Sequence, residues 1–135
     1  MVTNGEALHV GPLTITAHFT PGHTPGSTTW TWRSCEGRRC LDVVYADSLN
    51  PVSAPEYKFT RHSGAIEAFR NSIATVRNLP CDVLLSVHPG FAQLNEKFLR
   101  RSQSPDSNPF IDSASCRSYA DAATQSLDGR VRDEQ

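Results

Sequence analysis

Two Pro-Gly pairs, Pro21-Gly22 and Pro25-Gly26, lie on either side of His23 in the first quarter of the chain. Proline fixes φ and glycine accepts a positive φ, so both pairs predict tight turns. The flanking segments, Leu13–Phe19 and Thr28–Arg33, are rich in β-branched and aromatic residues, which is typical of strands. We therefore expect His23 on a stiff loop between two strands, where holding its imidazole in one position costs little entropy.

The middle of the chain changes from strand-like to helical periodicity. An apolar stripe recurs there at three- and four-residue steps: Ile66, Phe69, Ile73 and Val76. Ser63 is the expected N-cap of this helix, and Pro80 is expected to stop it.

The second half of the chain alternates between apolar and punctuated segments. The apolar run 81–87 predicts a strand buried on both faces, and it ends at His88-Pro89-Gly90. Helices are expected over Phe91–Arg101 and Ser113–Leu127, with residues 128–135 as a frayed tail. Strands followed by helix, strand and two helices indicate one α+β domain over residues 1–135, with a sheet packed against helices.

Composition excludes several classes of partner. The 135 residues carry a net charge of -1 with 20% charged residues, which gives no electrostatic basis for binding nucleic acid or a membrane surface. No apolar run approaches the roughly 20 residues of a membrane-spanning helix.

Four cysteines constrain the environment of the chain: Cys35, Cys40, Cys81 and Cys116. An even number favours disulfides and an oxidising compartment, but four cysteines allow three pairings. Cys35 and Cys40 enclose a hydrophilic turn between Thr28–Arg33 and the next strand candidate, Leu41–Ala46. A zinc site is the alternative, although no Cys-x-x-Cys pair is present.

His88 repeats the setting of His23, since it follows a strand directly and precedes a Pro-Gly turn. Asp47 ends a third strand, so these three side chains could converge at one sheet edge and hold zinc. Two histidines and an aspartate are few for a catalytic zinc, which needs three protein ligands and a water. The alternatives are solvated histidines and an Asx turn at Asp47; the remaining histidines are expected on the surface: His9, His18 and His62.

Four motifs in order resemble one known family: TPGHTPGSTTW, VVYADSLNPVSAP, NLPCDVLLSVHPG and CRSYADAA. Together they resemble the C-terminal half of a metallo-β-lactamase of the third subclass, in which serine replaces a zinc-binding cysteine. The resemblance extends from about Leu8 to Leu127. It implies half of an αββα sandwich, and a full-length enzyme that hydrolyses β-lactam antibiotics with two zinc ions.

The resemblance also implies roles for individual residues. His23 and His88 correspond to zinc ligands. Independently of the resemblance, the Asp47 carboxylate at the third strand end is a candidate to orient an imidazole beside them. Ser48 occupies the position of the subclass serine and, with Asn50, corresponds to the substrate-binding positions.

The same resemblance implies which cysteines pair. It implies a Cys81–Cys116 disulfide between the apolar strand and the last helix, and a Cys35–Cys40 bridge across the hairpin. Together with the family, these bridges imply a periplasmic or secreted enzyme.

One departure from the family limits these expectations. The main ligand motif, His-x-His-x-Asp-His, is absent from the 135 residues. We therefore expect a truncated enzyme or a gene fragment that begins at an internal methionine, with no catalytic residue of its own and no activity alone. The alternatives are a related hydrolase of lactones or thioesters, and a non-enzymatic binding module.

An isolated half-sandwich also leaves apolar surface uncovered. We expect self-association through an inner sheet face that contains Val43, Val44, Val83, Leu84, Leu85 and Trp30 or Trp32.

Overall fold

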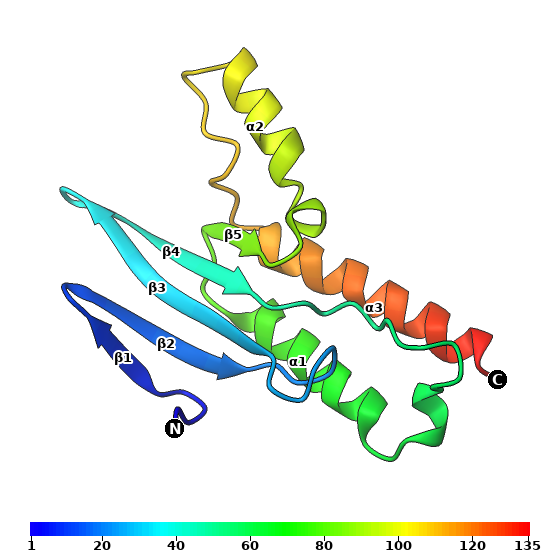
Figure 1. The fold of residues 1–135 in the computed structure, drawn as a ribbon. Coiled ribbons are helices and arrows are strands. Elements are labelled where there is room, and N and C mark those ends of the chain that lie inside the picture. Colours follow the sequence, from blue (N-terminus) through cyan, green and yellow to red (C-terminus); the bar gives the residue numbers. More distant parts are fainter.

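A five-stranded sheet forms one layer of the protein, whose computed structural model describes residues 1–135 (Figure 1). Its strands follow the chain in the order β1 (Ala7–Val10), β2 (Leu13–Phe19), β3 (Thr28–Glu36), β4 (Arg39–Ala46) and β5 (Val83–Ser86). The first four strands form an antiparallel meander, and β5 pairs with β4 in parallel. The expected α+β architecture is confirmed.

The strand predictions differ from the structure mainly in length. The prediction for β2 is confirmed with the same bounds. Strands β3 and β4 extend further into the hairpin, because Cys35 and Cys40 pair directly across it. Strand β1 was not expected, since four residues are too few to show a clear alternation.

Three α-helices complete the fold: α1 (Ala65–Asn78), α2 (Leu94–Gln103) and α3 (Ser115–Asp133). Short 3₁₀ turns precede α1 and α2, at η1 (Phe59–Arg61) and η2 (Pro89–Ala92). Helices α1 and α3 lie side by side, whereas α2 projects away from the sheet (Figure 1). None of these helices combines the length and apolarity that crossing a bilayer requires.

The start of α1 and the end of α3 both differ from the predictions. Ser63 is not the N-cap of α1, because Gly64 takes that position with a φ of 80°. The apolar stripe is confirmed, since Phe69, Ile73 and Val76 are buried.

Residues 128–135, the predicted frayed tail, continue α3 as a helix as far as Asp133. Glu134 explains this order, because its carboxylate accepts hydrogen bonds from the Thr60 backbone N–H and from Arg130. Arg130 also donates to Ser53 and to the Tyr57 carbonyl, which ties the end of α3 to the long loop after β4.

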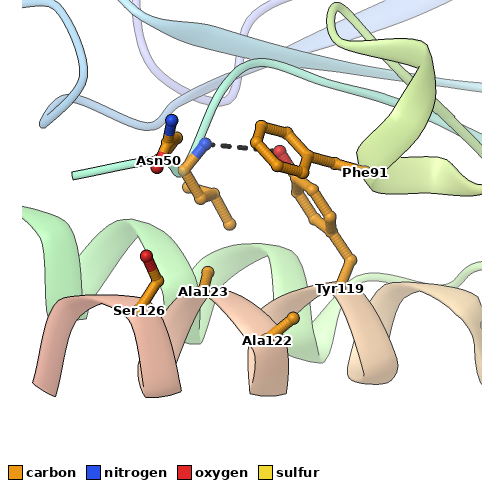
Figure 2. A pocket seen from close by; sticks show the side chains of 7 residues that line it. Asn50, Phe91, Tyr119, Ala122, Ala123 and Ser126 are labelled. Carbon is orange, nitrogen blue, oxygen red and sulfur yellow. Dashed lines mark hydrogen bonds between the residues drawn. The ribbon is translucent and has the colours of Figure 1, made fainter. Parts of the chain in front are cut away.

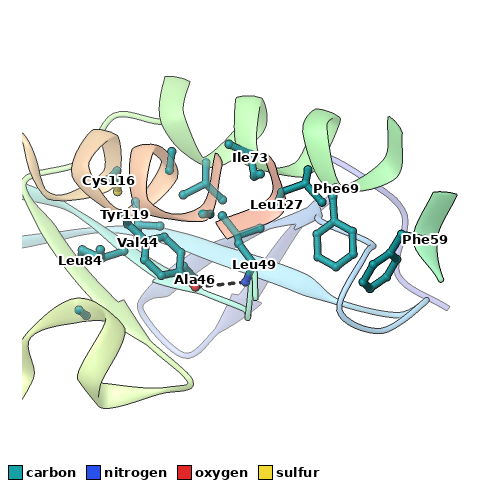
Figure 3. Packing of buried hydrophobic residues seen from close by; sticks show 14 residues of the cluster. Val44, Ala46, Leu49, Phe59, Phe69, Ile73, Leu84, Cys116, Tyr119 and Leu127 are labelled. Atoms are coloured by element: carbon teal, nitrogen blue, oxygen red, sulfur yellow. Dashed lines mark hydrogen bonds between the residues drawn. The ribbon is translucent and has the colours of Figure 1, made fainter. Parts of the chain in front are cut away.

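The core lies between the sheet and the helix pair α1 and α3 (Figure 3). Val44, Ala46 and Leu84 reach it from β4 and β5. Phe69 and Leu127 reach it from the two helices, and both are almost fully buried. Burial of such side chains is worth about 1.5–3 kcal/mol each, so this layer stabilises the packing of the helices on the sheet.

The opposite side of the sheet, which we call the open face, carries Trp30, Trp32, Val43, Tyr45, Val83 and Leu85. Their cross-strand register places all six on this side. None of the six belongs to the core cluster, and Tyr45 is 38% exposed although β4 lies inside the sheet. Val44 and Leu84 were expected on this face but lie on the helix side, because side chains alternate along a strand.

The same alternation corrects the prediction that β5 is buried on both faces. Leu84 and Ser86 are buried beneath the helices, whereas Val83 and Leu85 remain half-buried on the open face. A continuous apolar run indicates a strand with apolar side chains on both faces. In this chain the helices bury one face of β5, and the other remains partly exposed.

Both disulfides implied by the resemblance are present. Cys35–Cys40 closes the hairpin between β3 and β4. Cys81–Cys116 joins the segment before β5 to the first turn of α3, and Cys116 belongs to the core.

The two bridges are expected to stabilise the fold unequally, because they close loops of different length. Cys81–Cys116 spans 35 residues and Cys35–Cys40 spans 5. Loop-closure entropy predicts a loss of about 4 kcal/mol in unfolding free energy for the Cys81→Ala/Cys116→Ala variant and about 2 kcal/mol for Cys35→Ala/Cys40→Ala. Chemical denaturation followed by circular dichroism measures both; a larger loss in the hairpin variant contradicts this expectation.

Candidate metal and substrate site

The sheet topology brings three loops to one edge. Strands β2 and β4 both run antiparallel to β3, and β5 runs parallel to β4. The carboxyl ends of β2, β4 and β5 therefore point the same way. His23 follows β2, residues 47–50 follow β4, and His88 follows β5.

The structure places His23 and His88 side by side at this edge. Their ring centroids are 5.8 Å apart, and the ring planes are nearly perpendicular at 85°. His23 is half-buried, and His88 is exposed. No group of three or more histidine, cysteine, aspartate or glutamate side chains in the chain could hold a metal ion, so the pair has no third partner of this kind.

The loop that carries His23 is held by hydrogen bonds at both ends and in its middle. The Thr20 N–H donates to the Ser27 carbonyl, and the Gly22 N–H donates to the Thr24 carbonyl. Ser72 on α1 donates its hydroxyl hydrogen to the Pro21 carbonyl at 2.6 Å. The expected stiff loop is thus fastened both to itself and to the helix layer.

Gly22 allows the loop to lie directly against the core. Its φ is 150°, and a Cβ at this position would lie 2.8 Å from a ring carbon of Phe69. Phe69 is buried and packs edge-on against Phe59, so its ring has little room to move away.

A backbone carbonyl sets the orientation of the His23 imidazole. Nδ1 of His23 lies 2.9 Å from the carbonyl oxygen of Asn50. A carbonyl oxygen only accepts, so Nδ1 carries the hydrogen and the neutral ring keeps its lone pair on Nε2. A histidine held this way presents Nε2 as a donor to a metal ion.

Asp47 does not orient either histidine. One carboxylate oxygen accepts from the Thr28 N–H at 3.0 Å, and the other accepts from the Ser48 N–H at 2.6 Å. Asp47 therefore joins the end of β4 to the start of β3 and forms no Asx turn, because the N–H of Leu49, two residues on, donates to Tyr119 instead.

Ser48 and Asn50 have different accessibility. Ser48 is 1% exposed, and its hydroxyl oxygen accepts from the Asn50 N–H. Asn50 is half-buried, and its side chain makes no hydrogen bond within the protein. Of the two predicted substrate positions, Asn50 thus has the available polar group.

Tyr119 on α3 is a site residue that the sequence reasoning missed. Its hydroxyl donates to the Asp47 carbonyl at 3.0 Å. It also accepts from the Leu49 N–H at 3.3 Å, the bond drawn as a dashed line in Figure 2. Burial raises the pKa of the Tyr119 hydroxyl, which favours its protonated, donating form. The motif CRSYADAA contained this tyrosine, but only the fold shows that it holds the segment before Asn50.

The other histidines lie outside the site. His9 and His62 are exposed, as expected. His18 is half-buried, contrary to the expectation of a surface residue, and its Nε2 lies 2.9 Å from the Thr31 hydroxyl oxygen. Burial lowers the pKa of His18, consistent with a neutral ring in the sheet.

Solved structures resemble this chain over nearly its full length. The Rm3 metallo-β-lactamase matches 99% of the chain with 47% identity and a TM-score of 0.93. MEM-A1, a subclass B3 metallo-β-lactamase isolated from a soil metagenome library, matches 98% with 39% identity and a TM-score of 0.92. The chain thus matches, over nearly its full length, one half of the subclass B3 metallo-β-lactamases.

The match covers only part of each relative. The chain spans 51% of the Rm3 and MEM-A1 chains and 47% of MIM-1 from Novosphingobium pentaromativorans, which is 31% identical with a TM-score of 0.86. It corresponds to the C-terminal half of the metallo-β-lactamase fold. A scan against protein-family models finds no match.

Replacement of Gly22 tests how closely the histidine loop of this metallo-β-lactamase half depends on the core. Gly22→Ala is expected to lower the unfolding free energy by about 2 kcal/mol, because its Cβ collides with Phe69 at a positive φ. Gly26→Ala is the control, since a Cβ there meets nothing within 4 Å and its φ is not in the positive region. Equal stability of the two variants in urea denaturation contradicts this account of the loop.

Proposed function

We propose that this chain forms the C-terminal half of a zinc-dependent β-lactam hydrolase and contributes His23 and His88 as zinc ligands. The observation that carries the proposal is the 5.8 Å separation of the two imidazoles at one sheet edge. The similarity to subclass B3 metallo-β-lactamases over 99% of the chain supports it.

The residues present fit part of a zinc site. Neutral imidazole nitrogen is a common zinc donor, and the Asn50 carbonyl leaves Nε2 of His23 free for this role. A catalytic zinc needs three protein ligands, and the chain brings two histidines together here. The remaining ligands of both zinc ions are proposed to come from the half of the full-length fold that these residues do not include.

When bound, zinc supplies a Lewis acid for the lactam carbonyl and a nucleophile from water at neutral pH. The residues of this chain orient the reactants around that chemistry. The Asn50 amide is proposed to donate a hydrogen bond to the substrate carboxylate. Ser48 is proposed to act beneath it, where its hydroxyl accepts the Asn50 N–H and fixes the position of that residue.

The disulfides support a place of action outside the cytoplasm. Two bridges in a chain of this size fit an oxidising compartment. Together with the family, they support a periplasmic or secreted enzyme.

Zinc binding by the chain itself tests the proposed ligands. The 135 residues are expected to bind zinc weakly, and His23→Ala or His88→Ala is expected to weaken binding at least about tenfold, because each removes one of two donors. His9→Ala is the matched control, since His9 lies in β1 at the far edge of the sheet. Isothermal titration calorimetry measures all three; equal affinities in the two site variants and the wild type contradict the proposal.

The same preparation tests activity. The chain alone is expected to show no chelator-sensitive nitrocefin turnover, and turnover is expected when it is mixed with the complementary half of the Rm3 fold. Robust turnover by the chain alone contradicts the expected inactivity. Zinc-dependent turnover of a lactone or thioester, without any of nitrocefin, would instead favour the alternative hydrolase.

The open face supports a proposal of self-association for the chain alone. Apolar side chains at the centre of a sheet, such as Tyr45 and Trp32, favour burial against another surface. Sedimentation velocity is expected to show dimers or larger species at micromolar concentration. Tyr45→Lys is expected to shift the distribution towards monomer because it places a charge on the open face.

Phe98→Lys is the control for this experiment. Phe98 is 62% exposed on α2, which projects away from the sheet (Figure 1), so its replacement is expected to leave the distribution unchanged. A wild-type chain that sediments as a monomer contradicts the proposal.

A further inference from the structure

A small cavity lies between α3 and the loop after β4 (Figure 2). Leu49 and Phe91 line it from the loop side, and Tyr119, Ala122 and Ala123 line it from the helix. Asn50 and Ser126 complete the lining, so five of the seven residues are hydrophobic.

The volume of the cavity limits what it can hold. It measures about 80 Å³ and is partly open to solvent. A buried cavity of about 150 Å³ binds benzene, and whole drug-sized ligands need about 300 Å³ or more. The cavity therefore fits a single apolar group, such as part of one ring or a branched alkyl group, whose remainder extends outside.

The polar groups around the cavity determine which ligands suit it. The Tyr119 hydroxyl is occupied by the Asp47 carbonyl and the Leu49 N–H, so Tyr119, Ala122 and Ala123 offer an apolar surface. Asn50 and Ser126 lie towards the same side of the cavity in Figure 2, and neither side chain hydrogen-bonds within the protein. A ligand with an apolar end and an adjacent hydrogen-bonding group would place the first against the apolar lining and the second against Asn50 and Ser126.

Fixed elements keep the cavity open. Ala122 and Ala123 are small residues on a 19-residue helix, and larger side chains at these positions would fill the space. Leu49 is 1% exposed and is held to Tyr119 through its N–H, so the opposite wall cannot easily collapse.

The cavity adjoins both histidines through its own lining residues. The Asn50 carbonyl accepts from His23, and the Phe91 ring lies edge-on to His88 at 5.5 Å between centroids. A group bound in the cavity is therefore separated from His23 by Asn50 and from His88 by Phe91.

We propose that this cavity is a subsite for one apolar substituent of the small molecule that binds at the histidine pair, with Asn50 bonding the polar group beside it. This inference rests on the proposed function for the identity of that molecule. It assigns aryl or branched alkyl side chains as the preferred substituents and makes Ala122 and Ala123 specificity-determining positions.

Titration of the metal-free chain with benzyl alcohol tests the subsite independently of zinc. With alanine methyl groups labelled by ¹³C, saturable shifts are expected at Ala122 and Ala123, with nuclear Overhauser effects to the probe ring. The side-chain NH₂ signals of Asn50 are expected to shift in the same titration, because the probe hydroxyl lies beside that amide.

Two matched variants separate cavity binding from binding elsewhere. Ala122→Phe fills the space from an exposed helix position and is expected to weaken probe binding at least about tenfold. Ala74→Phe makes the same change at an exposed position of α1 and is expected to leave binding unchanged. The absence of saturable shifts at Ala122 and Ala123, or equal binding by the two variants, overturns the inference; a failure of zinc binding instead overturns only the proposed function.

Discussion

The hydrogen bond from His23 Nδ1 to the Asn50 carbonyl is the contact on which the candidate site depends. It fixes the hydrogen on Nδ1 and leaves Nε2 available. The carbonyl is itself held in place, because Tyr119 donates to Asp47 and accepts from Leu49 in the residues just before it. Helix α3 therefore determines the orientation of an imidazole that lies almost a hundred residues earlier in the chain.

Sheet topology explains why the other site residues lie nearby. An antiparallel meander followed by a parallel strand turns three carboxyl ends towards one edge. The sheet also separates two environments: the helix side holds a packed core, whereas the open face remains partly exposed. The chain thus combines two neighbouring imidazoles at one sheet edge with one partly uncovered apolar face, and it spans about half of its relatives.

Turn residues and apolar periodicity in the sequence were sufficient to predict much of this structure. Turn chemistry placed His23 and His88 at strand ends, and periodicity identified Phe69, Ile73 and Val76 as the buried stripe of α1. Features that depend on distant contacts were missed. The Tyr119 hydroxyl bonds the loop after β4, and Glu134 bonds Thr60, which holds the end of α3 in place. Both contacts join segments that are far apart in sequence. The faces of Val44 and Leu84 depend on strand register, which an apolar run does not reveal.

The tautomer of the neutral His23 ring tests the central claim most directly. In ¹⁵N NMR spectra of the neutral ring, the account predicts the hydrogen on Nδ1, with that tautomer less favoured in Tyr119→Phe because the Asn50 carbonyl loses its support. Phenylalanine keeps the ring of Tyr119 and removes only the hydroxyl, so packing is largely preserved. A neutral His23 protonated on Nε2 in the wild-type chain would contradict the account.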